Sequence, residues 1–293
     1  GYNHVDADGL GEDTDSFEMK SGQASGSRWG LKGTEDLGNG LTVGFILEDG
    51  FSSDTGSEGE DVMFNRESSL FIEGGFGKLA MGRIGSINNG QSSWATVGMI
   101  NAFGTSDWGG YSAQVGNIMA TAGVWDNMVA YQTPEFAGFK VYAQYGMGNT
   151  VTDYDSVENE SSSDRFYSLG LTYNNGPFAG YFAVDSINYK TAKFSENEWP
   201  RNGDDVDDSL TVTLGGSYDF DVVKIYFGAQ YFDEVRLASI SGVLNQAGDG
   251  EPFDPRVDTP INEIAKIKGY GISLTGDAPL GGGRAMFGVG YLD

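Results

Sequence analysis

The chain has 293 residues, no cysteine and a formal net charge of −25 at pH 7, and it combines 46 glycines with 13% aromatic residues. The absence of cysteine excludes a disulfide scaffold and a cysteine-ligated zinc site. The acidic charge makes nucleic acid a poor partner because its phosphates would be repelled, and no apolar run reaches the ~18–20 residues of a membrane-spanning helix.

Apolar residues recur at every second position in blocks of about ten residues, which is the period of β-strands. The alternation is clearest in FKVYAQY (139–145) and VVKIYFGAQY (222–231). Taken in chain order, the pattern predicts about thirteen strands, over residues 1–5, 17–36, 40–50, 62–74, 78–86, 127–134, 138–147, 164–174, 177–189, 208–218, 221–233, 264–275 and 282–293.

The connections between these segments alternate between tight turns and long loops. The tight ones are LGNG, GGFG, PEFAG, NNGP, YDFD and APLGG, which carry residues that favour turns. The long ones cover residues 6–16, 51–61, 87–126, 148–163, 190–207 and 234–263. This alternation predicts an up-and-down antiparallel meander, and loops of this length are unusual inside a compact soluble domain.

The same period fits a soluble β protein and a membrane β-barrel, whose apolar faces point in opposite directions. The strand lengths match a tilted crossing of the hydrocarbon layer, and the mean hydropathy is low, at −0.31, despite the apolar stripe. Aromatic residues gather near the strand ends, as they do at membrane interfaces: Tyr131, Phe136, Phe139, Tyr173, Phe178, Tyr218, Phe220 and Tyr291. These features favour an all-β transmembrane barrel.

Three hairpin segments then resemble a known family. SGSRWGLKGTEDLGNGLTVGFILEDGF (25–51) is similar to the strand–turn–strand signature of Gram-negative general porins of the trimeric proteobacterial type. FNRESSLFIEGGFGKLAMGRIGS (64–86) resembles the next hairpin of that family, and NMVAYQTPEFAGFKVYAQY (127–145) resembles the hairpin after its third loop. The likeness extends over residues 1–293, whereas the loops diverge.

The resemblance implies one β-barrel domain over residues 1–293, located in the outer membrane of a Gram-negative bacterium, with about sixteen strands in the complete protein. Because a barrel cannot leave strand edges open in lipid, the count of about thirteen leads us to expect that the sequence is incomplete at both ends. The implied function is passive diffusion of small hydrophilic solutes and ions through a water-filled homotrimeric channel, with outer-membrane lipid and lipopolysaccharide as further partners.

The loop at 87–126 differs from the other long loops because it is apolar and contains few acids. A loop of this composition is not expected to stay in water. In the porins that the chain resembles, the third loop folds into the lumen and narrows the pore. The resemblance therefore implies a constriction formed by 87–126, with Phe103, Asp107, Trp108 and Tyr111 at the narrow point. The alternative is a loop that covers a contact between subunits.

Basic residues are expected on the wall that faces this loop. Arg28, Lys32 and Arg284 share the polar side of their strands by the two-residue period. A basic wall opposite Asp107 would set a transverse field across a narrow water-filled gap. The alternative for each arginine is solvation at the rim or a salt bridge between subunits.

Two further arginines are assigned to this wall only by the resemblance. Arg66 and Arg83 match positions where the family lines its pore with arginine. By strand parity, however, Arg66 would share a side with Leu70, and Arg83 would share a side with Met81. A β-bulge near Gly82 would re-aim Arg83.

The charged residues make opposite predictions about ion selectivity. Porins with arginine-lined walls favour anions, but most of the 42 acids lie in the long loops and would give the outer mouth of the pore a negative potential. Fields from the mouth are screened within ~8–10 Å at physiological salt, so we expect the constriction to dominate and to give a weak anion preference. The acidic loops could bind Ca²⁺ or Mg²⁺ and so bridge to lipopolysaccharide phosphates, although their acidity also serves solubility alone. The example residues are Asp204, Asp205, Asp207 and Asp208.

No enzyme and no other cofactor are expected. The single histidine, His4, leaves a Ser–His hydrolase without a placed general base, and carboxylate-only chemistry has no positive support. Two alternatives to a general porin stay open. One is a substrate-specific channel for small organic or inorganic anions with an aromatic track in the third loop. The other is a surface structural or adhesion protein that uses its acidic loops.

Overall fold

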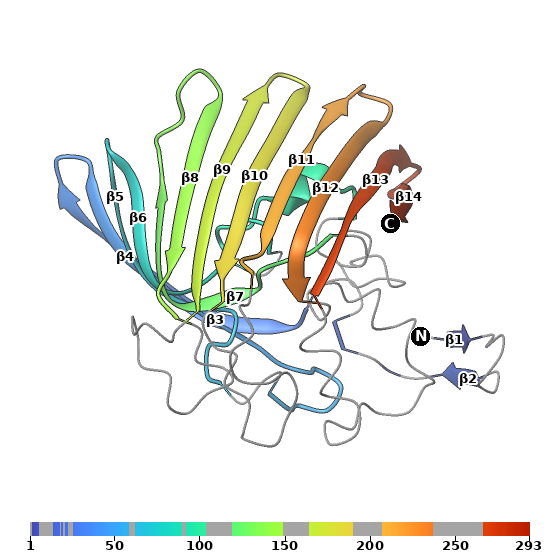
Figure 1. The fold of residues 1–293 in the computed structure, drawn as a ribbon, viewed down its shortest axis with the longest axis horizontal. Coiled ribbons are helices and arrows are strands. Elements are labelled where there is room, and N and C mark those ends of the chain that lie inside the picture. The colour runs from blue at the N-terminus through green and yellow to red at the C-terminus, as the bar shows by residue number, and fades with distance from the viewer. Residues whose placement is uncertain are drawn as a thin grey trace.

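The computed structural model describes residues 2–5, 14–17, 19, 21–22, 26–58, 62–89, 92–103, 119–148, 164–189, 207–236 and 266–293. Twelve strands form one antiparallel sheet in which each strand pairs with its neighbours in sequence (Figure 1). They are β3 (Arg28–Gly38), β4 (Leu41–Gly50), β5 (Glu67–Gly74), β6 (Gly77–Gly85), β7 (Val124–Gln132), β8 (Phe139–Gly146), β9 (Arg165–Asn175), β10 (Phe178–Asn188), β11 (Leu210–Asp219), β12 (Lys224–Arg236), β13 (Lys266–Leu280) and β14 (Gly283–Leu292).

This order confirms the expected up-and-down meander. All six tight connections are those expected from the sequence, for example Asn39–Gly40 between β3 and β4, where both residues have positive φ. Among the described residues the sheet ends at β3 on one side and β14 on the other. A sixteen-stranded closed barrel stays a prediction.

The first two strands differ from expectation. The segment 17–36 was expected to be one strand, but β3 begins only at Arg28, and a short strand β2 (Thr14–Phe17) precedes it. β2 pairs with β1 (Tyr2–Val5) in a separate two-stranded sheet, so the expected loop at 6–16 extends too far. The described residues thus contain fourteen strands, against about thirteen expected. The reason lies in Ser21 and Gly22, which form a turn with a positive φ at the glycine and interrupt the alternation.

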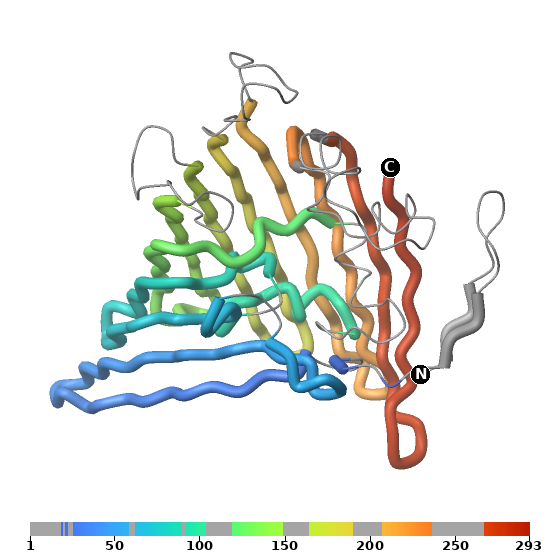
Figure 2. The backbone as a smooth tube through the Cα atoms, turned by 90° about the horizontal axis from the view of Figure 1, so that it is seen from below, coloured from blue at the N-terminus to red at the C-terminus, as the bar shows by residue number. Residues whose placement is uncertain are grey.

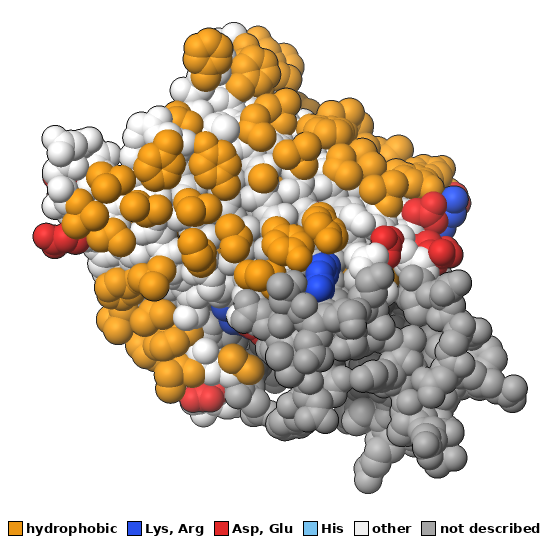
Figure 3. Space-filling view, turned by 60° about the vertical axis from the view of Figure 1, so that its left-hand side comes forward, with side chains coloured by type: hydrophobic (Ala, Val, Ile, Leu, Met, Phe, Trp, Pro, Cys, Tyr) orange, Lys and Arg blue, Asp and Glu red, His pale blue; other side chains and the backbone are white. Residues whose placement is uncertain are grey.

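The sheet is apolar on its outer face and polar on the face that its curvature encloses. Leu70, Leu169 and Leu214 are 65%, 55% and 56% exposed, and hydrophobic side chains cover the outer face in Figure 3. The cross-strand register places apolar residues of neighbouring strands side by side, since Leu214 pairs with Phe182 and Ala229. Buried polar side chains lie on the opposite face: Gln144, Ser168, Thr213, Gln230 and Thr275. This distribution is the reverse of a soluble sheet protein and is that of a membrane barrel.

Exposed aromatic side chains gather where the strands meet the tight turns. The rings of Phe139 and Tyr173 lie 4.3 Å apart, those of Tyr173 and Phe178 lie 6.0 Å apart, and those of Tyr218 and Phe220 lie 4.6 Å apart. Together they form an aromatic row along one end of β8 to β12. Such a row matches an interfacial girdle at the side of the membrane where the short turns lie.

The described part of the chain contains one short helix, η1 (Val97–Ile100), which lies in the long connection between β6 and β7. None of the helices in the described part is long and apolar enough to cross a membrane. The long connection runs across the polar face of the sheet (Figure 2) and builds the main apolar cluster against it.

Candidate functional site

Two buried glutamines of the polar face hold the long connection by both atoms of their amide groups. Gln144 Oε1 accepts from the backbone N of Ile87 at 3.0 Å, and its Nε2 donates to the carbonyl of Gly85 at 3.1 Å. Gln230 Oε1 accepts from the backbone N of Ala120 at 2.6 Å, and its Nε2 donates to the carbonyl of the same residue at 3.1 Å. Each glutamine thus satisfies a donor and an acceptor of buried irregular backbone, which would otherwise cost free energy.

Further anchors lie at both sides of the sheet. On β5, the carboxylate of Glu67 accepts from the backbone N of Ser93 at 2.8 Å and from its hydroxyl at 2.9 Å. On β13, the hydroxyl of Thr275 accepts from the backbone N of Ala102 at 2.9 Å. The connection is therefore fixed to strands from β5 to β13 and crosses most of the polar face.

A third group of polar contacts joins the connection to β10. The side-chain amide of Asn88 donates to the carboxylate of Asp185, and the hydroxyl of Tyr181 donates to the side-chain oxygen of Asn88. All three side chains are buried. The side-chain amide of Asn88 is therefore hydrogen-bonded through its nitrogen and through its oxygen to two side chains of β10.

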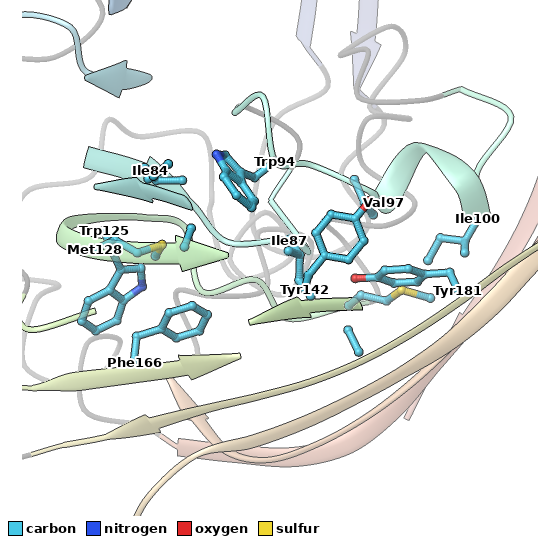
Figure 4. Packing of buried hydrophobic residues seen from close by; sticks show 14 residues of the cluster. Ile84, Ile87, Trp94, Val97, Ile100, Trp125, Met128, Tyr142, Phe166 and Tyr181 are labelled. Carbon is cyan, nitrogen blue, oxygen red and sulfur yellow. The ribbon is translucent and has the colours of Figure 1, made fainter. Parts of the chain in front are cut away.

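The apolar side chains of the connection fill the space between these anchors (Figure 4). The ring of Trp125 stacks on that of Phe166 at 5.3 Å, and its Nε1 donates to the carbonyl of Ala122 at 2.7 Å. Glycines on the wall make room, because a Cβ at Gly215 would overlap with the side chain of Ile100. The residues that the connection contributes to the cluster are Ile87, Trp94, Val97, Ile100 and Met119, with Met99 and Ala122 packed against it.

Arg28, Arg66 and Lys32 lie on the polar face, and two of them share one carboxylate. Glu48 lies 2.7 Å from Arg66 (Oε1 to Nε) and 3.8 Å from Arg28 (Oε2 to Nε). Lys32 pairs across the strands with Ile46, two residues from Glu48 on the same face. Arg66 precedes β5, so the strand parity that placed it with the apolar residues does not apply to it, and its side chain turns to Glu48.

The expected bulge at Gly82 is present as a register shift between Gly82 and Ile84 in the pairing of β6 with β7. It places Arg83 beside Asp126, with 2.8 Å between Nη1 and Oδ1, and Arg83 Nε also donates to the carbonyl of Asn65 at 2.9 Å. Arg83 is 9% exposed. Its charge is therefore compensated in a buried ion pair rather than presented to water.

Arg284 lies at the opposite end of the sheet, next to the tight turn between β13 and β14. Its guanidinium contacts the carboxylate of Asp277, which also accepts from the hydroxyl of Tyr226 at 3.1 Å. Arg28 and Arg66 lie at the end of the long loops. The structure therefore does not bring Arg284 together with them in one ring.

The expected residues of the third loop and of the acidic loops are only partly within the described residues. Phe103 is half-buried, and its backbone N donates to the side chain of Asn101 at 3.2 Å. Asp208 accepts from the side chain of Asn188 at 2.6 Å, and Asp207 is exposed. In the described ranges no group of three or more His, Cys, Asp or Glu side chains could hold a metal ion. Asp107, Trp108, Tyr111, Asp204 and Asp205 lie outside the described residues.

The sequence analysis missed the anchors Glu67, Asn88, Gln144 and Gln230. A signal for two of them was available. Gln144 and Gln230 are uncharged amides on the polar parity of β8 and β12, near the strand ends that lead into the long loops. A buried amide needs partners, so such a position indicates that another segment covers it.

A curved antiparallel sheet with an apolar outside, a polar inside and an anchored inner loop defines a β-barrel channel of the outer-membrane type. The family model for the Gram-negative porin matches residues 1–293, and the chain belongs to this family. The expected fold class, the location in the outer membrane of a Gram-negative bacterium and the membership in a family of channels rather than enzymes are thereby confirmed.

Individual relatives agree with this assignment. The chain is 32% identical to an outer membrane porin protein of Bordetella pertussis, over 98% of this chain and 75% of that protein. It is 29% identical to outer membrane porin protein 32 of Delftia acidovorans, over 76% of this chain and 58% of that protein. Among solved structures, the anion-selective porin from Comamonas acidovorans superposes with a TM-score of 0.62 and 25% identity, over 91% of this chain and 68% of that one.

Proposed function

We propose that the protein is a general porin through which small hydrophilic solutes and ions diffuse passively along a water-filled lumen. The observation that carries this proposal is the polar inner face with a connection fixed across it by Glu67, Gln144, Gln230 and Thr275. A loop held at so many points narrows the enclosed space without closing it, and the narrowing then filters solutes by size and charge.

The constriction in this proposal is the loop 87–126, with Phe103, Asp107, Trp108 and Tyr111 at its narrow part. The wall opposite is formed by Arg28, Lys32 and Arg66. The complete protein is a closed barrel and works as a homotrimer in contact with outer-membrane lipid and lipopolysaccharide. A trimer also fits the exposed apolar outer face, part of which would be covered by neighbouring subunits.

A weak anion preference follows from the charges on this wall. Arg28 and Arg66 both lie beside Glu48, and Lys32 lies on the same face opposite Ile46, so three basic side chains gather at this end of the wall. The anion selectivity of the Comamonas acidovorans porin is in line with this reading. The acids of the outer loops act on the mouth, where salt screens them within about 8–10 Å.

Planar-bilayer recordings of the complete protein in a KCl gradient test the proposal. We expect large openings in groups of three and a reversal potential biased toward chloride. The absence of conductance would contradict the porin function, and a bias toward potassium would contradict only the selectivity. Conductance blocked by micromolar amounts of one anion would favour the substrate-specific alternative.

Two substitutions at the shared carboxylate should move this potential in opposite directions. Arg66→Gln removes one wall charge and should lower the anion-to-cation permeability ratio by up to about sevenfold. One unit charge at ~7 Å in water attracts an anion and repels a cation by ~0.6 kcal/mol each, so the difference between the two ions is ~1.2 kcal/mol. Glu48→Gln removes the compensating charge and should raise the ratio by a similar factor.

The control for these two variants is Lys268→Gln. Lys268 lies on the outer parity of β13 together with Tyr270 and Ile272, and it pairs with Asp233. Losing that charge should leave the reversal potential unchanged. Equal shifts in all three variants would mean that the net charge of the molecule, rather than the wall at Glu48, sets the selectivity.

A further inference from the structure

The side chain of Lys78 reaches the long connection from the tight-turn end of the sheet. Lys78 is the second residue of β6, directly after the tight turn that joins β5 to β6. The two-residue period places it on the polar face, opposite to the exposed Met81. Its Nζ lies 4.2 Å from the ring centre of Phe71 on β5 and 5.4 Å from the ring centre of Trp94 in the connection. One cation thus contacts both the wall and the loop.

These contacts hold the ammonium beside the loop without cancelling its charge. An ammonium over an aromatic face is attracted by the ring quadrupole, and the ring carries no net charge. Glu73 lies directly opposite Lys78 in the register of β5 with β6, but it is exposed. Among the described residues no carboxylate forms an ion pair with Lys78. Arg83 on the same strand is the contrast, because its guanidinium is paired with Asp126.

Lys78 and Arg66 approach the same part of the connection from opposite ends of the sheet. Arg66 directly precedes Glu67, whose carboxylate accepts two hydrogen bonds from Ser93. Lys78 contacts the ring of the next residue, Trp94, from the tight-turn end. The anchored segment of the connection therefore has a basic side chain toward each end of the strands.

We propose that Lys78 is a second specificity-determining residue, which supplies a fixed positive charge on the tight-turn side of the connection. The inference rests on the proposed porin function. A small anion that has passed the basic wall at the long-loop end meets this further positive charge before it leaves the pore, and a cation is repelled at the same place. The rings of Phe71 and Trp94 keep the charge at the loop, where the lumen is narrow and salt screens it less than at the mouth.

The test is the reversal potential of the complete protein in planar bilayers with a KCl gradient. Lys78→Met keeps an unbranched apolar side chain against the rings and removes the charge. It should lower the anion-to-cation permeability ratio by up to about fourfold, equivalent to the ~0.8 kcal/mol by which a unit charge at ~10 Å in water distinguishes the two ions. Lys78→Arg should retain the ratio, because a guanidinium keeps its charge and also stacks on aromatic rings.

Lys140→Met is the matched control. Lys140 is likewise the second residue of its strand, β8, and lies on the polar face, but among the described residues it contacts no aromatic ring and no carboxylate. Its loss should change the ratio by less than about 1.5-fold, because salt screens a charge at the wide mouth. Equal falls in Lys140→Met and Lys78→Met, or no fall in Lys78→Met, would overturn the proposal and leave the porin function intact. A wild type without conductance would overturn both.

Lys78→Cys adds a chemical rescue, since the chain has no cysteine of its own. Its thiolate attacks 2-aminoethyl methanethiosulfonate, methanesulfinate leaves, and the new disulfide carries an ammonium at nearly the length of lysine. This reaction should restore the wild-type ratio. The sulfonatoethyl reagent adds a negative charge and should lower the ratio below that of unmodified Lys78→Cys. Shifts in the same direction with both reagents would mean that bulk rather than charge controls passage at this position, and the proposal would be wrong.

Discussion

Replacing Leu214 with arginine should destabilise the protein by about 2–4 kcal/mol, because the side chain lies in the middle of β11 on the face that meets lipid. Leu214 is 56% exposed and is flanked by Phe182 and Ala229 on the neighbouring strands. In a soluble protein, so exposed a position would tolerate arginine with little loss. Equilibrium refolding into lipid vesicles, with urea as denaturant and at a fixed protein concentration, measures the difference.

Leu210→Arg is the matched control for this prediction. It lies on the same face of the same strand but at the end of β11, next to the long loop. There an arginine reaches the polar interface, and the expected loss is only about 0–1 kcal/mol. Equal losses of unfolding free energy at Leu210 and Leu214 would contradict the claim that the middle of the outer face lies in the hydrocarbon layer of the membrane.

Removing the partner of Arg83 should have an effect of comparable size. Asp126→Ala removes the carboxylate that lies 2.8 Å from a guanidinium that is 9% exposed, and the loss of one partner from a buried ion pair costs about 3–5 kcal/mol. Because Asp126 itself is 21% exposed, we expect a value at the lower end, about 3 kcal/mol. The same urea titration measures it.

Two further variants test whether the pair of Arg83 with Asp126 is buried. The double variant Arg83→Met with Asp126→Leu should recover most of the loss, since apolar residues of similar size can replace a buried ion pair at little cost. Asp233→Ala breaks the exposed pair with Lys268 and should be close to neutral. If Asp126→Ala behaved like Asp233→Ala, the pair with Arg83 would be open to water rather than buried.

Most of the fold could be predicted from the sequence because the strands and tight turns of a β-barrel are determined by residues that are close together in sequence. The two-residue period identifies the strands, and Gly, Asn and Pro identify the turns that join them. The exception at 17–36 arose where Ser21 and Gly22 form a turn inside a run that otherwise alternates. There a weak local signal was overridden by the pairing of β1 with β2.

The candidate site could be predicted only in part because its contacts join segments that are distant in sequence. The parity of Arg28 and Lys32 is local, and the structure places both on the polar face as expected. The link between Gln230 and Ala120 spans 110 residues, and the pair of Arg83 with Asp126 spans 43. No local pattern indicates which carboxylate an arginine will meet, so the compensation of Arg83 was not foreseen.

Single cysteines at Lys140 and Val141 test the central claim, which is that the two faces of the sheet meet water and lipid. These residues are adjacent on β8, where Lys140 shares the polar face with Tyr142 and Val141 faces outward. The chain has no cysteine of its own, so each variant carries one thiol. In lipid vesicles, a charged water-soluble thiol reagent should modify Lys140→Cys and spare Val141→Cys, and a lipid-soluble maleimide should show the opposite preference. Modification of Val141→Cys by the charged reagent, together with protection of Lys140→Cys, would contradict the inside-out barrel.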